Sequence, residues 1–137
     1  MTSFIFSKMP DLAVGYRQRL RELTLGPGTP WGMWQWPLRG GAVWAMIAFW
    51  GTDLRTDQMI GWSAVSLEED LIPVIGCFVA PTYRKRGLAT TLVTSVIHSL
   101  RGTGVLADGD EVAAVTSRWP MYEDVIAACG LVCKEWQ

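Results

Sequence analysis

The sequence predicts a single α/β domain, residues 1–137, built on a mixed β-sheet. Half of the residues are apolar, which is enough for one sizeable core in a chain of this length. Along the chain, short apolar runs typical of strands alternate with stripes at helical spacing, and no repeat or linker separates them. The expected order is strand, helix, three strands, helix, strand, helix, strand.

The first expected elements are a strand over residues 3–7 and a helix that begins at Pro10 and Asp11. Glycine and proline residues at 26–30 end this helix. The apolar residues that recur on it at helical spacing are Leu12, Tyr16, Leu20 and Leu23.

Three strands follow, over residues 42–50, 59–67 and 72–79, and the first two form a hairpin. Gly76 interrupts the third strand. A glycine inside a strand is typical of a bulge or of a close approach between backbones.

An amphipathic helix comes next and ends at Gly102 and Gly104. A strand over residues 111–116, a short helix from Pro120 to Gly130 and a last strand over 131–136 complete the chain. The apolar stripe of the amphipathic helix comprises Leu88, Ala89, Leu92, Val93, Val96, Ile97 and Leu100.

Composition excludes several classes of function. The net charge of −1 argues against a nucleic-acid partner, because phosphate binding needs a broad basic surface. No apolar run is long enough to span a membrane, and the N-terminus lacks a secretory signal. Three cysteines without CxxC spacing, and one histidine, favour reduced thiols in a cytoplasmic protein and no metal site.

The chemistry is concentrated where the third strand leads into the amphipathic helix. The loop Arg84-Lys85-Arg86 is basic, and it precedes a helix start whose first N–H groups have no partner within the helix. Gly87 lets the backbone approach a ligand closely, and Ala89 is nearly as small. These features suit a pyrophosphate. Neither a Walker loop nor a Rossmann fingerprint is present.

This segment resembles the acetyl-CoA signature of the GNAT family of acetyltransferases. The signature positions are filled here by Val79, Pro81, Arg84, Gly87 and Ala89. The order of elements along the chain is also similar to that family. The resemblance implies an α+β fold, with a mainly antiparallel sheet flanked by helices, and acetyl-CoA as co-substrate.

The resemblance further implies which residues hold the cofactor. The backbone of the third strand, at Cys77, Phe78 and Val79, is expected to pair with the pantetheine arm as another strand would, and the N–H of Phe78 or Val79 polarises the thioester carbonyl. The N–H groups that hold the pyrophosphate belong to Arg84, Lys85, Arg86, Gly87, Leu88, Ala89 and Thr90.

The general acid is less clearly marked. In the resembled family a tyrosine before a Gly-Phe pair protonates the leaving sulfur. Here the pair is Gly130-Leu131, and the corresponding position is Ile126. Tyr122 lies one helical turn earlier on the same face, where it is either the acid or a packed side chain.

No carboxylate lies on the strand over residues 72–79 to act as a base. The cluster Glu68, Glu69 and Asp70 at its mouth either acts through water or forms a solvated turn. His98 falls on the polar side of its helix, as a surface residue does. Cys77 is expected to be a small buried hydrophobe.

The predicted function is acetyl transfer to a primary amine, on a small molecule or a protein. Trp34 and Trp36, with Glu69, are the candidate acceptor-binding residues, although the tryptophans could equally fill the core. The alternative is a catalytically silent acyl-CoA-binding module that engages a protein partner. Exposed tryptophans and edge strands are also compatible with a homodimer.

Overall fold

The computed structural model describes residues 1–24, 43–67, 72–84, 86–114 and 121–135. The strands in this part of the chain are β1 (Thr2–Lys8), β2 (Val43–Trp50), β3 (Met59–Ser66), β4 (Val74–Val79), β5 (Glu111–Ala114) and β6 (Val132–Glu135). The α-helices are α1 (Val14–Thr24), α3 (Leu88–Gly102) and α4 (Met121–Ala128). Short 3₁₀ turns are η1 (Met9–Asp11), η2 (Thr56–Gln58) and η3 (Pro81–Tyr83).

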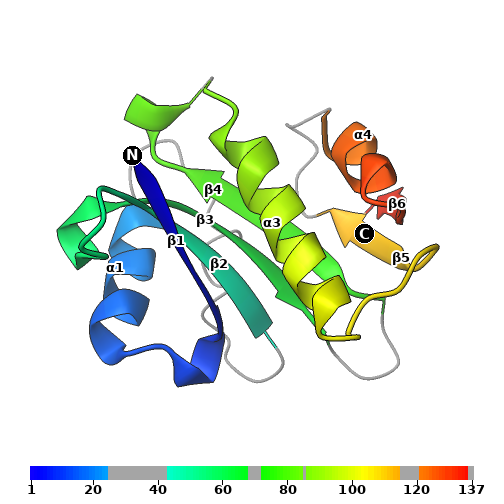
Figure 1. The fold of residues 1–137 in the computed structure, drawn as a ribbon, viewed down its shortest axis with the longest axis horizontal. Coiled ribbons are helices and arrows are strands. Elements are labelled where there is room, and N and C mark those ends of the chain that lie inside the picture. The colour runs from blue at the N-terminus through cyan, green and yellow to red at the C-terminus, as the bar shows by residue number, and fades with distance from the viewer. Residues whose placement is uncertain (25–42, 68–71, 85, 115–120, 136–137) are drawn as a thin grey trace.

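All six strands form one sheet in the order in which they occur along the chain. The three pairs from β1 to β4 are antiparallel, and the two pairs from β4 to β6 are parallel. The predicted mixed, mainly antiparallel sheet flanked by helices is therefore confirmed, as is the order of the elements (Figure 1).

The sheet separates two apolar clusters. Met46 and Ala48 of β2 pack with α3 and α4 on one face, whereas Ala45 and Ile47 pack with Leu20 of α1 on the other. This alternation along β2 is the period of two that a strand imposes on its side chains. Both faces are covered, which is why β2 and β3 read as continuous apolar runs rather than as alternating ones.

The helix α3 is held on the sheet by its apolar stripe and by a buried hydrogen bond. Leu92, Val96 and Leu100 are fully buried against the strands. Ser63 of β3 is also fully buried, and its hydroxyl donates to the Leu92 carbonyl at 2.8 Å. A buried hydroxyl with its partner in place costs little, and this one fixes how far α3 slides along β3.

Several element boundaries differ from the sequence prediction, and two of these differences concern where an element begins. The expected helix start at Pro10 and Asp11 is the 3₁₀ turn η1, and α1 begins only at Val14. The strand expected from residue 72 begins at Val74, after Pro73, which has no N–H to donate to a ladder. None of the helices in the described ranges has the length and apolar composition needed to cross a bilayer.

The prediction of a bulge at Gly76 is wrong for the pairing of β4 with β3. The β3–β4 register runs without a shift through Gly76, which pairs with Ala64. The irregularity lies instead between β2 and β3, where the pairing shifts after Ala48 and leaves Ile60 as the extra residue. A bulge inserts one unpaired residue and increases the local twist.

Candidate functional site

The candidate site begins where β4 and β5 separate. These two strands pair only at Val74 with Ala113 and at Ile75 with Ala114. Beyond Ile75, no residue in the described ranges pairs with this edge of β4, while residues 115–120 lie outside them. The last four residues of β4 therefore carry a backbone edge with no described strand beside it.

The register of β4 fixes which backbone groups face this edge. The Ala80 N–H donates to the Ile60 carbonyl at 2.8 Å. Because hydrogen-bonded positions alternate along an antiparallel pair, Phe78 points its N–H and C=O toward β3. Cys77 and Val79 point theirs the other way, toward the separation from β5. Of the two donors expected near the thioester, only that of Val79 faces the open edge.

One acceptor on this edge is already engaged. The Arg84 side chain folds back, and its Nε donates to the Val79 carbonyl at 2.9 Å. Its guanidinium carbon lies 5.6 Å from the centre of the Phe78 ring. The edge thus retains the Val79 N–H and both backbone groups of Cys77 for a ligand.

The start of α3 carries backbone N–H groups of the kind that bind an anion. The first helical hydrogen bond runs from the Thr91 N–H to the Gly87 carbonyl at 3.1 Å, and no acceptor within the described part of the chain meets the N–H groups of Leu88, Ala89 and Thr90. Gly87 caps the helix with a φ of 77°, a left-handed conformation that glycine adopts without strain. A Cβ built on Gly87 would meet no atom within 4 Å, so the space beside it is open.

The residues of the basic loop differ in what they can contribute to anion binding at the start of α3. The Arg84 N–H donates to the Pro81 carbonyl at 3.3 Å, within the turn η3, which leaves the charge of Arg84 rather than its N–H for a phosphate. The exposed Arg86 guanidinium lies 5.7 Å from the centre of the Tyr83 ring. Lys85 lies outside the described residues.

Both helices on this face begin at the same end of the sheet, at the top of Figure 1. Tyr122 occupies the first turn of α4, and its side chain lies outside the described part. Ile126, one turn further on, is fully buried in the core. The position that carries tyrosine in the resembled family is therefore a packing position in this chain.

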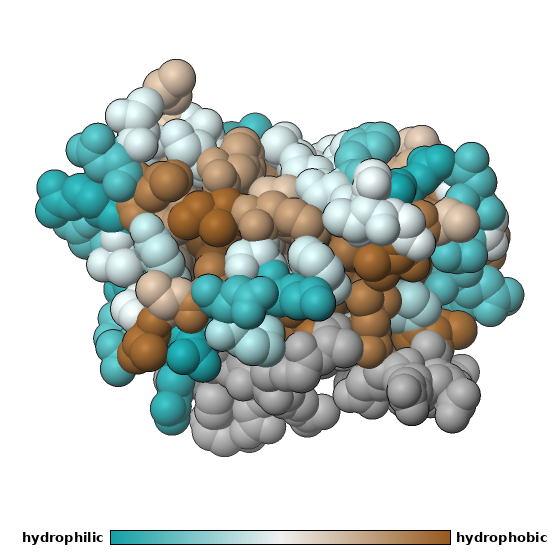
Figure 2. All heavy atoms as spheres, turned by 60° about the horizontal axis from the view of Figure 1, so that its bottom comes forward, coloured by the Kyte–Doolittle hydropathy of each residue, from teal (hydrophilic) through white to brown (hydrophobic). Residues whose placement is uncertain are grey.

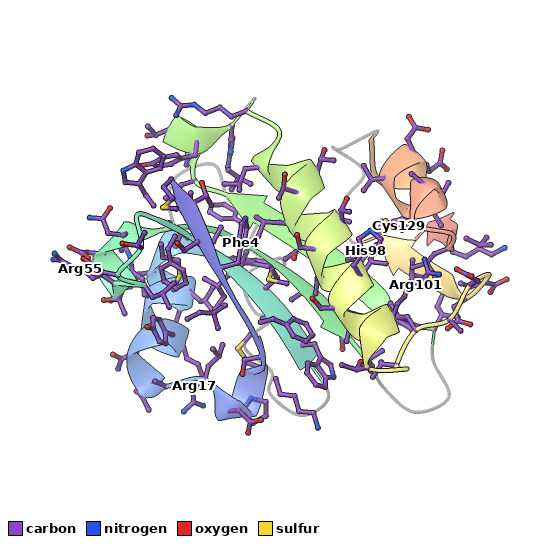
Figure 3. The ribbon with its side chains drawn as sticks, in the orientation of Figure 1. Phe4, Arg17, Arg55, His98, Arg101 and Cys129 are labelled. Carbon is purple, nitrogen blue, oxygen red and sulfur yellow. The ribbon has the colours of Figure 1, made fainter. Side chains whose placement is uncertain are left out.

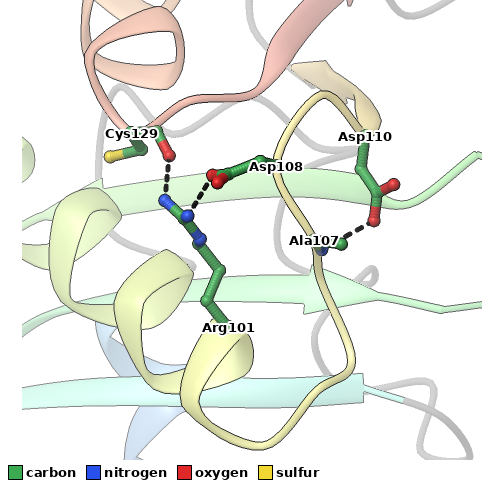
Figure 4. Close-up of polar contacts among 5 residues, drawn as sticks. All are labelled: Arg101, Ala107, Asp108, Asp110 and Cys129. Atoms are coloured by element: carbon green, nitrogen blue, oxygen red, sulfur yellow. Dashed lines mark hydrogen bonds and ion pairs between the residues drawn. The ribbon is translucent and has the colours of Figure 1, made fainter.

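The opposite end of α4 is fixed by Arg101 (Figure 4). Its guanidinium donates to the Cys129 carbonyl at the end of α4 and pairs with Asp108 in the loop before β5. Gly130 makes this approach feasible, because a Cβ there would lie 2.8 Å from an Asp108 carboxylate oxygen. This contact links α3 to the end of α4 and to the loop before β5.

Gly61 allows β3 to pack closely against the end of β4. A Cβ at this position would lie 2.8 Å from the Phe78 carbonyl oxygen, 3.3 Å from Leu92 Cδ1 and 3.3 Å from Val79 Cα. Gly61 is thus a position of close backbone approach that was not predicted, and its neighbours are the proposed ligand-binding backbone.

We expect Gly61→Ala to destabilise the protein by about 1–3 kcal/mol, because the new methyl group must displace either the end of β4 or α3. Acetyl-CoA affinity should fall as well, since Phe78 and Val79 shift together. Denaturant unfolding and ligand titration measure the two effects. Gly102→Ala is the control, because a Cβ there meets nothing within 4 Å. Equal stability of the two variants would show that β3 and β4 can move apart without a loss of unfolding free energy.

The thiol of Cys77 points toward α3, where its Sγ lies 4.0 Å from the Ala89 carbonyl oxygen. Burial raises the pKa of this thiol to about 12. Below that pH the group is a neutral thiol, and the thiolate is the nucleophilic form. Cys77 is half-buried and packs against the core cluster under α3, so it behaves as the expected small hydrophobe without being fully buried.

We therefore expect native Cys77 to resist iodoacetamide at neutral pH and Cys77→Ala to retain near-wild-type acetyl transfer. Peptide mapping after native labelling, compared with labelling of the unfolded chain, measures the first expectation. Rapid native labelling of Cys77, together with loss of activity in the alanine variant, would indicate a covalent role.

A groove of about 230 Å³ runs between α3 and α4. His98 is exposed there, as predicted for a surface residue, and Figure 3 shows it on α3 beside Cys129 of α4. Among the described residues, no three histidine, cysteine or acidic side chains come close enough to hold a metal ion. The residues that line the groove are Thr90, Thr94, His98, Asp124, Val125, Ala128 and Cys129.

A second hollow, of about 290 Å³, adjoins the start of α3 on the side of β1. This hollow was not predicted from the sequence, where the aromatic residues Phe4 and Trp50 are the available signal for it. Figure 2 shows hydrophobic side chains gathered across the left and centre of its view. The residues that line the hollow are Thr2, Phe4, Trp50, Ile60, Tyr83, Arg86, Leu88 and Thr91.

The structure brings together the end of β4 and the start of α3, as the motif predicted. The candidate acceptor residues Trp34, Trp36 and Glu69 lie outside the described ranges, as does most of the acidic turn around Glu69. Their placement stays a prediction.

Comparison with known proteins agrees with this geometry. Residues 18–126 match the sequence model of the acetyltransferase (GNAT) family. No curated protein matches the sequence. Solved structures similar to this one include an acyl-CoA N-acyltransferase from Pseudomonas aeruginosa, with a TM-score of 0.59 and 15% identity over 77% of this chain and 72% of that one.

Two further structures resemble a larger share of the chain. The ribosomal-protein-S18-alanine N-acetyltransferase from Escherichia coli has a TM-score of 0.58 and 15% identity, covering 93% of this chain and 77% of that one. A GNAT family acetyltransferase from Streptococcus pneumoniae has a TM-score of 0.58 and 14% identity, covering 95% and 86%. At these identities the likeness shows a shared fold.

Proposed function

Because the chain belongs to the GNAT family of acetyltransferases, we propose that it transfers an acetyl group from acetyl-CoA to a primary amine by direct attack. The observation that carries this proposal is the open backbone edge at the end of β4, beside an unpaired helix start. One site thus offers donors for a thioester and for a pyrophosphate.

The residues present fit the nucleotide end of acetyl-CoA. The N–H groups of Leu88, Ala89 and Thr90 meet no acceptor among the described residues and lie at the positive end of the helix dipole, which favours an anion. The missing Cβ at Gly87 leaves open space next to them. Arg84 and Arg86 add positive charge around the same loop, although the chain as a whole is slightly acidic.

The residues of β4 and α4 would perform the chemistry. We assign the Val79 N–H as the donor to the thioester carbonyl oxygen, where negative charge develops, because it faces the open edge. Tyr122 is assigned as the acid for the departing thiolate, because it lies in the turn of α4 that starts at this end of the sheet. The neutral thiol of Cys77 favours direct transfer over an acyl-cysteine.

The proposed acceptor is an amine on a small molecule, a peptide or a protein. Trp34 and Trp36 would hold its cationic form against their rings, and Glu69 would complement its charge. The Escherichia coli relative acts, by its name, on an alanine of ribosomal protein S18. A likeness in fold does not carry that acceptor over, so peptide N-termini and small amines are equal candidates.

The proposal is tested by incubating the protein with acetyl-CoA and a panel of small amines, peptides with free N-termini, and lysine peptides. We expect mass spectrometry to detect an acetylated amine that depends on acetyl-CoA and on the protein. Protein without acetyl-CoA, and the panel without protein, are the controls.

A silent acyl-CoA-binding module is the second candidate, because Ile126 stands where the family's tyrosine is expected. Thermal melts with acetyl-CoA separate the outcomes. A raised melting temperature without transfer to any amine would favour the silent module. An unchanged melting temperature and no transfer would contradict both functions.

A further inference from the structure

The strand β1 lies at one edge of the described sheet and offers its outer backbone edge for pairing. It covers Thr2–Lys8, has no proline, and carries a charge only at its last residue. Natural proteins commonly protect such edges with charges, prolines or bulges, and an unprotected edge is a template for another strand. Phe4 on this strand is 37% exposed, and Trp50, its neighbour at the end of β2, is 47% exposed.

The pairing with β2 fixes which residues of β1 are free to accept a partner. The Gly51 N–H donates to the Met1 carbonyl at 2.7 Å, so this pair of positions is a hydrogen-bonded one. Alternation then directs the backbone groups of Ser3, Ile5 and Ser7 toward β2. The groups that point outward, away from the sheet, belong to Thr2, Phe4, Phe6 and Lys8.

The sequence of β1 is complementary to itself. The segment Ser3-Phe4-Ile5-Phe6-Ser7 reads the same in both directions. In an antiparallel pair of two copies centred on Ile5, Phe4 lies opposite Phe6 of the second copy, and Thr2 lies opposite Lys8. These are the residues whose backbone groups point outward, so the centred register satisfies all four outward positions of each strand. A shift by two residues in either direction leaves one of them unpaired.

The side chains agree with the same register. Phe6 stacks on Trp44 with ring centres 5.1 Å apart, and the Lys8 ammonium lies 5.2 Å from the Trp44 ring centre. Pairing about Ile5 would place Phe4 of the second copy next to Phe6, which extends this stack across the two-fold axis. Cross-strand aromatic pairs of this kind stabilise antiparallel sheets.

We propose that two copies of this chain form a dimer through β1, with antiparallel pairing centred on Ile5 that joins their sheets. A two-fold axis requires the same patch on both subunits, and the palindromic strand meets that requirement. Pairing with a strand of a different protein would not require the sequence of β1 to be palindromic. The proposed partner is therefore a second copy of the chain.

Light scattering coupled to size exclusion tests the assembly. The wild type is expected at twice the chain mass of 15.2 kDa. Phe4→Lys should be monomeric, because the two new ammonium groups become diagonal neighbours across the axis. Val14→Lys, an equally drastic change at an exposed position of α1, should remain dimeric. A monomeric wild type, or a Phe4→Lys variant that still dimerises with unchanged circular dichroism, would overturn the proposal.

Disulfide formation tests the register. Ile5 of the two copies would form a non-hydrogen-bonded pair with Cα atoms about 4.5 Å apart, within the range that a disulfide spans. Ile5→Cys should therefore cross-link to its own copy on mild oxidation. Ser7→Cys should not, because the two positions lie about 14 Å apart along the strands. Cross-linking of Ser7→Cys instead, or of neither variant beyond the wild-type background, would overturn pairing about Ile5.

Discussion

The Gly87→Glu variant is expected to fold and to lose acetyl-CoA binding. Gly87 lies immediately before the unpaired N–H groups of Leu88, Ala89 and Thr90. A glutamate there places a carboxylate in the space proposed for a phosphate and neutralises part of the surrounding positive charge. At a hundredfold excess of ligand over its Kd, the wild type gains about 2.7 kcal/mol from binding, and the variant should gain none.

The chain offers a closely matched control for this experiment. Gly104, at the other end of α3, has a φ of 81° and nothing within 4 Å of a built Cβ, just as Gly87 has a φ of 77° and open space. Both substitutions therefore force a side chain into a left-handed conformation, which costs about 1–2 kcal/mol. Gly104→Glu should show the same loss of stability while its melting temperature still rises with acetyl-CoA. Normal binding by Gly87→Glu would place the pyrophosphate elsewhere.

The Tyr122→Phe variant is expected to lose about 10²-fold or more in kcat while acetyl-CoA affinity stays nearly unchanged. The removed hydroxyl is the proposed proton donor for the thiolate, and phenylalanine keeps the aromatic ring at this position in the first turn of α4. Steady-state kinetics with saturating acetyl-CoA measures kcat, and a ligand titration measures affinity.

Tyr16→Phe is the control for the loss of a phenol. The Tyr16 hydroxyl donates to the Leu54 carbonyl at 2.7 Å on the α1 side of the sheet, away from the proposed site. Its removal should lower stability by about 1 kcal/mol and leave kcat unchanged. If Tyr122→Phe turns over at the wild-type rate, Tyr122 is a packing residue and the acid lies elsewhere.

Most of the fold was predictable because its signals are local. The stripe from Leu88 to Leu100 and the apolar runs of β2 and β3 each identify an element from neighbouring residues alone. Gly87 was predictable for the same reason, since a glycine between a basic loop and a helix start indicates both a turn and an anion site. The start of α1 was less predictable, because proline followed by an acid begins a 3₁₀ turn as readily as an α-helix.

The details of the site depend on distant pairings that no local pattern contains. Gly61 interrupts an apolar strand just as Gly76 does, and only the β3–β4 packing shows that a side chain at Gly61 would meet the Phe78 carbonyl. The hydrogen bond from the Arg84 side chain to the Val79 carbonyl depends on the turn η3, which lies between the two residues. Which of Phe78 and Val79 faces the open edge depends on one hydrogen bond to Ile60, across the strand pair.

The direction of the β4 backbone has a consequence for how such a chain can evolve. Cys77 and Val79 turn their N–H groups to the open edge and their side chains into the packing beneath α3. The groups proposed to meet the thioester are therefore main-chain atoms, which nearly every amino acid supplies. Substitutions at these positions are therefore limited by side-chain volume rather than by side-chain chemistry. Proline alone is excluded, because it carries no amide hydrogen. A function held in the backbone tolerates wide divergence in sequence, and the solved structures that share this fold are about 15% identical to this chain.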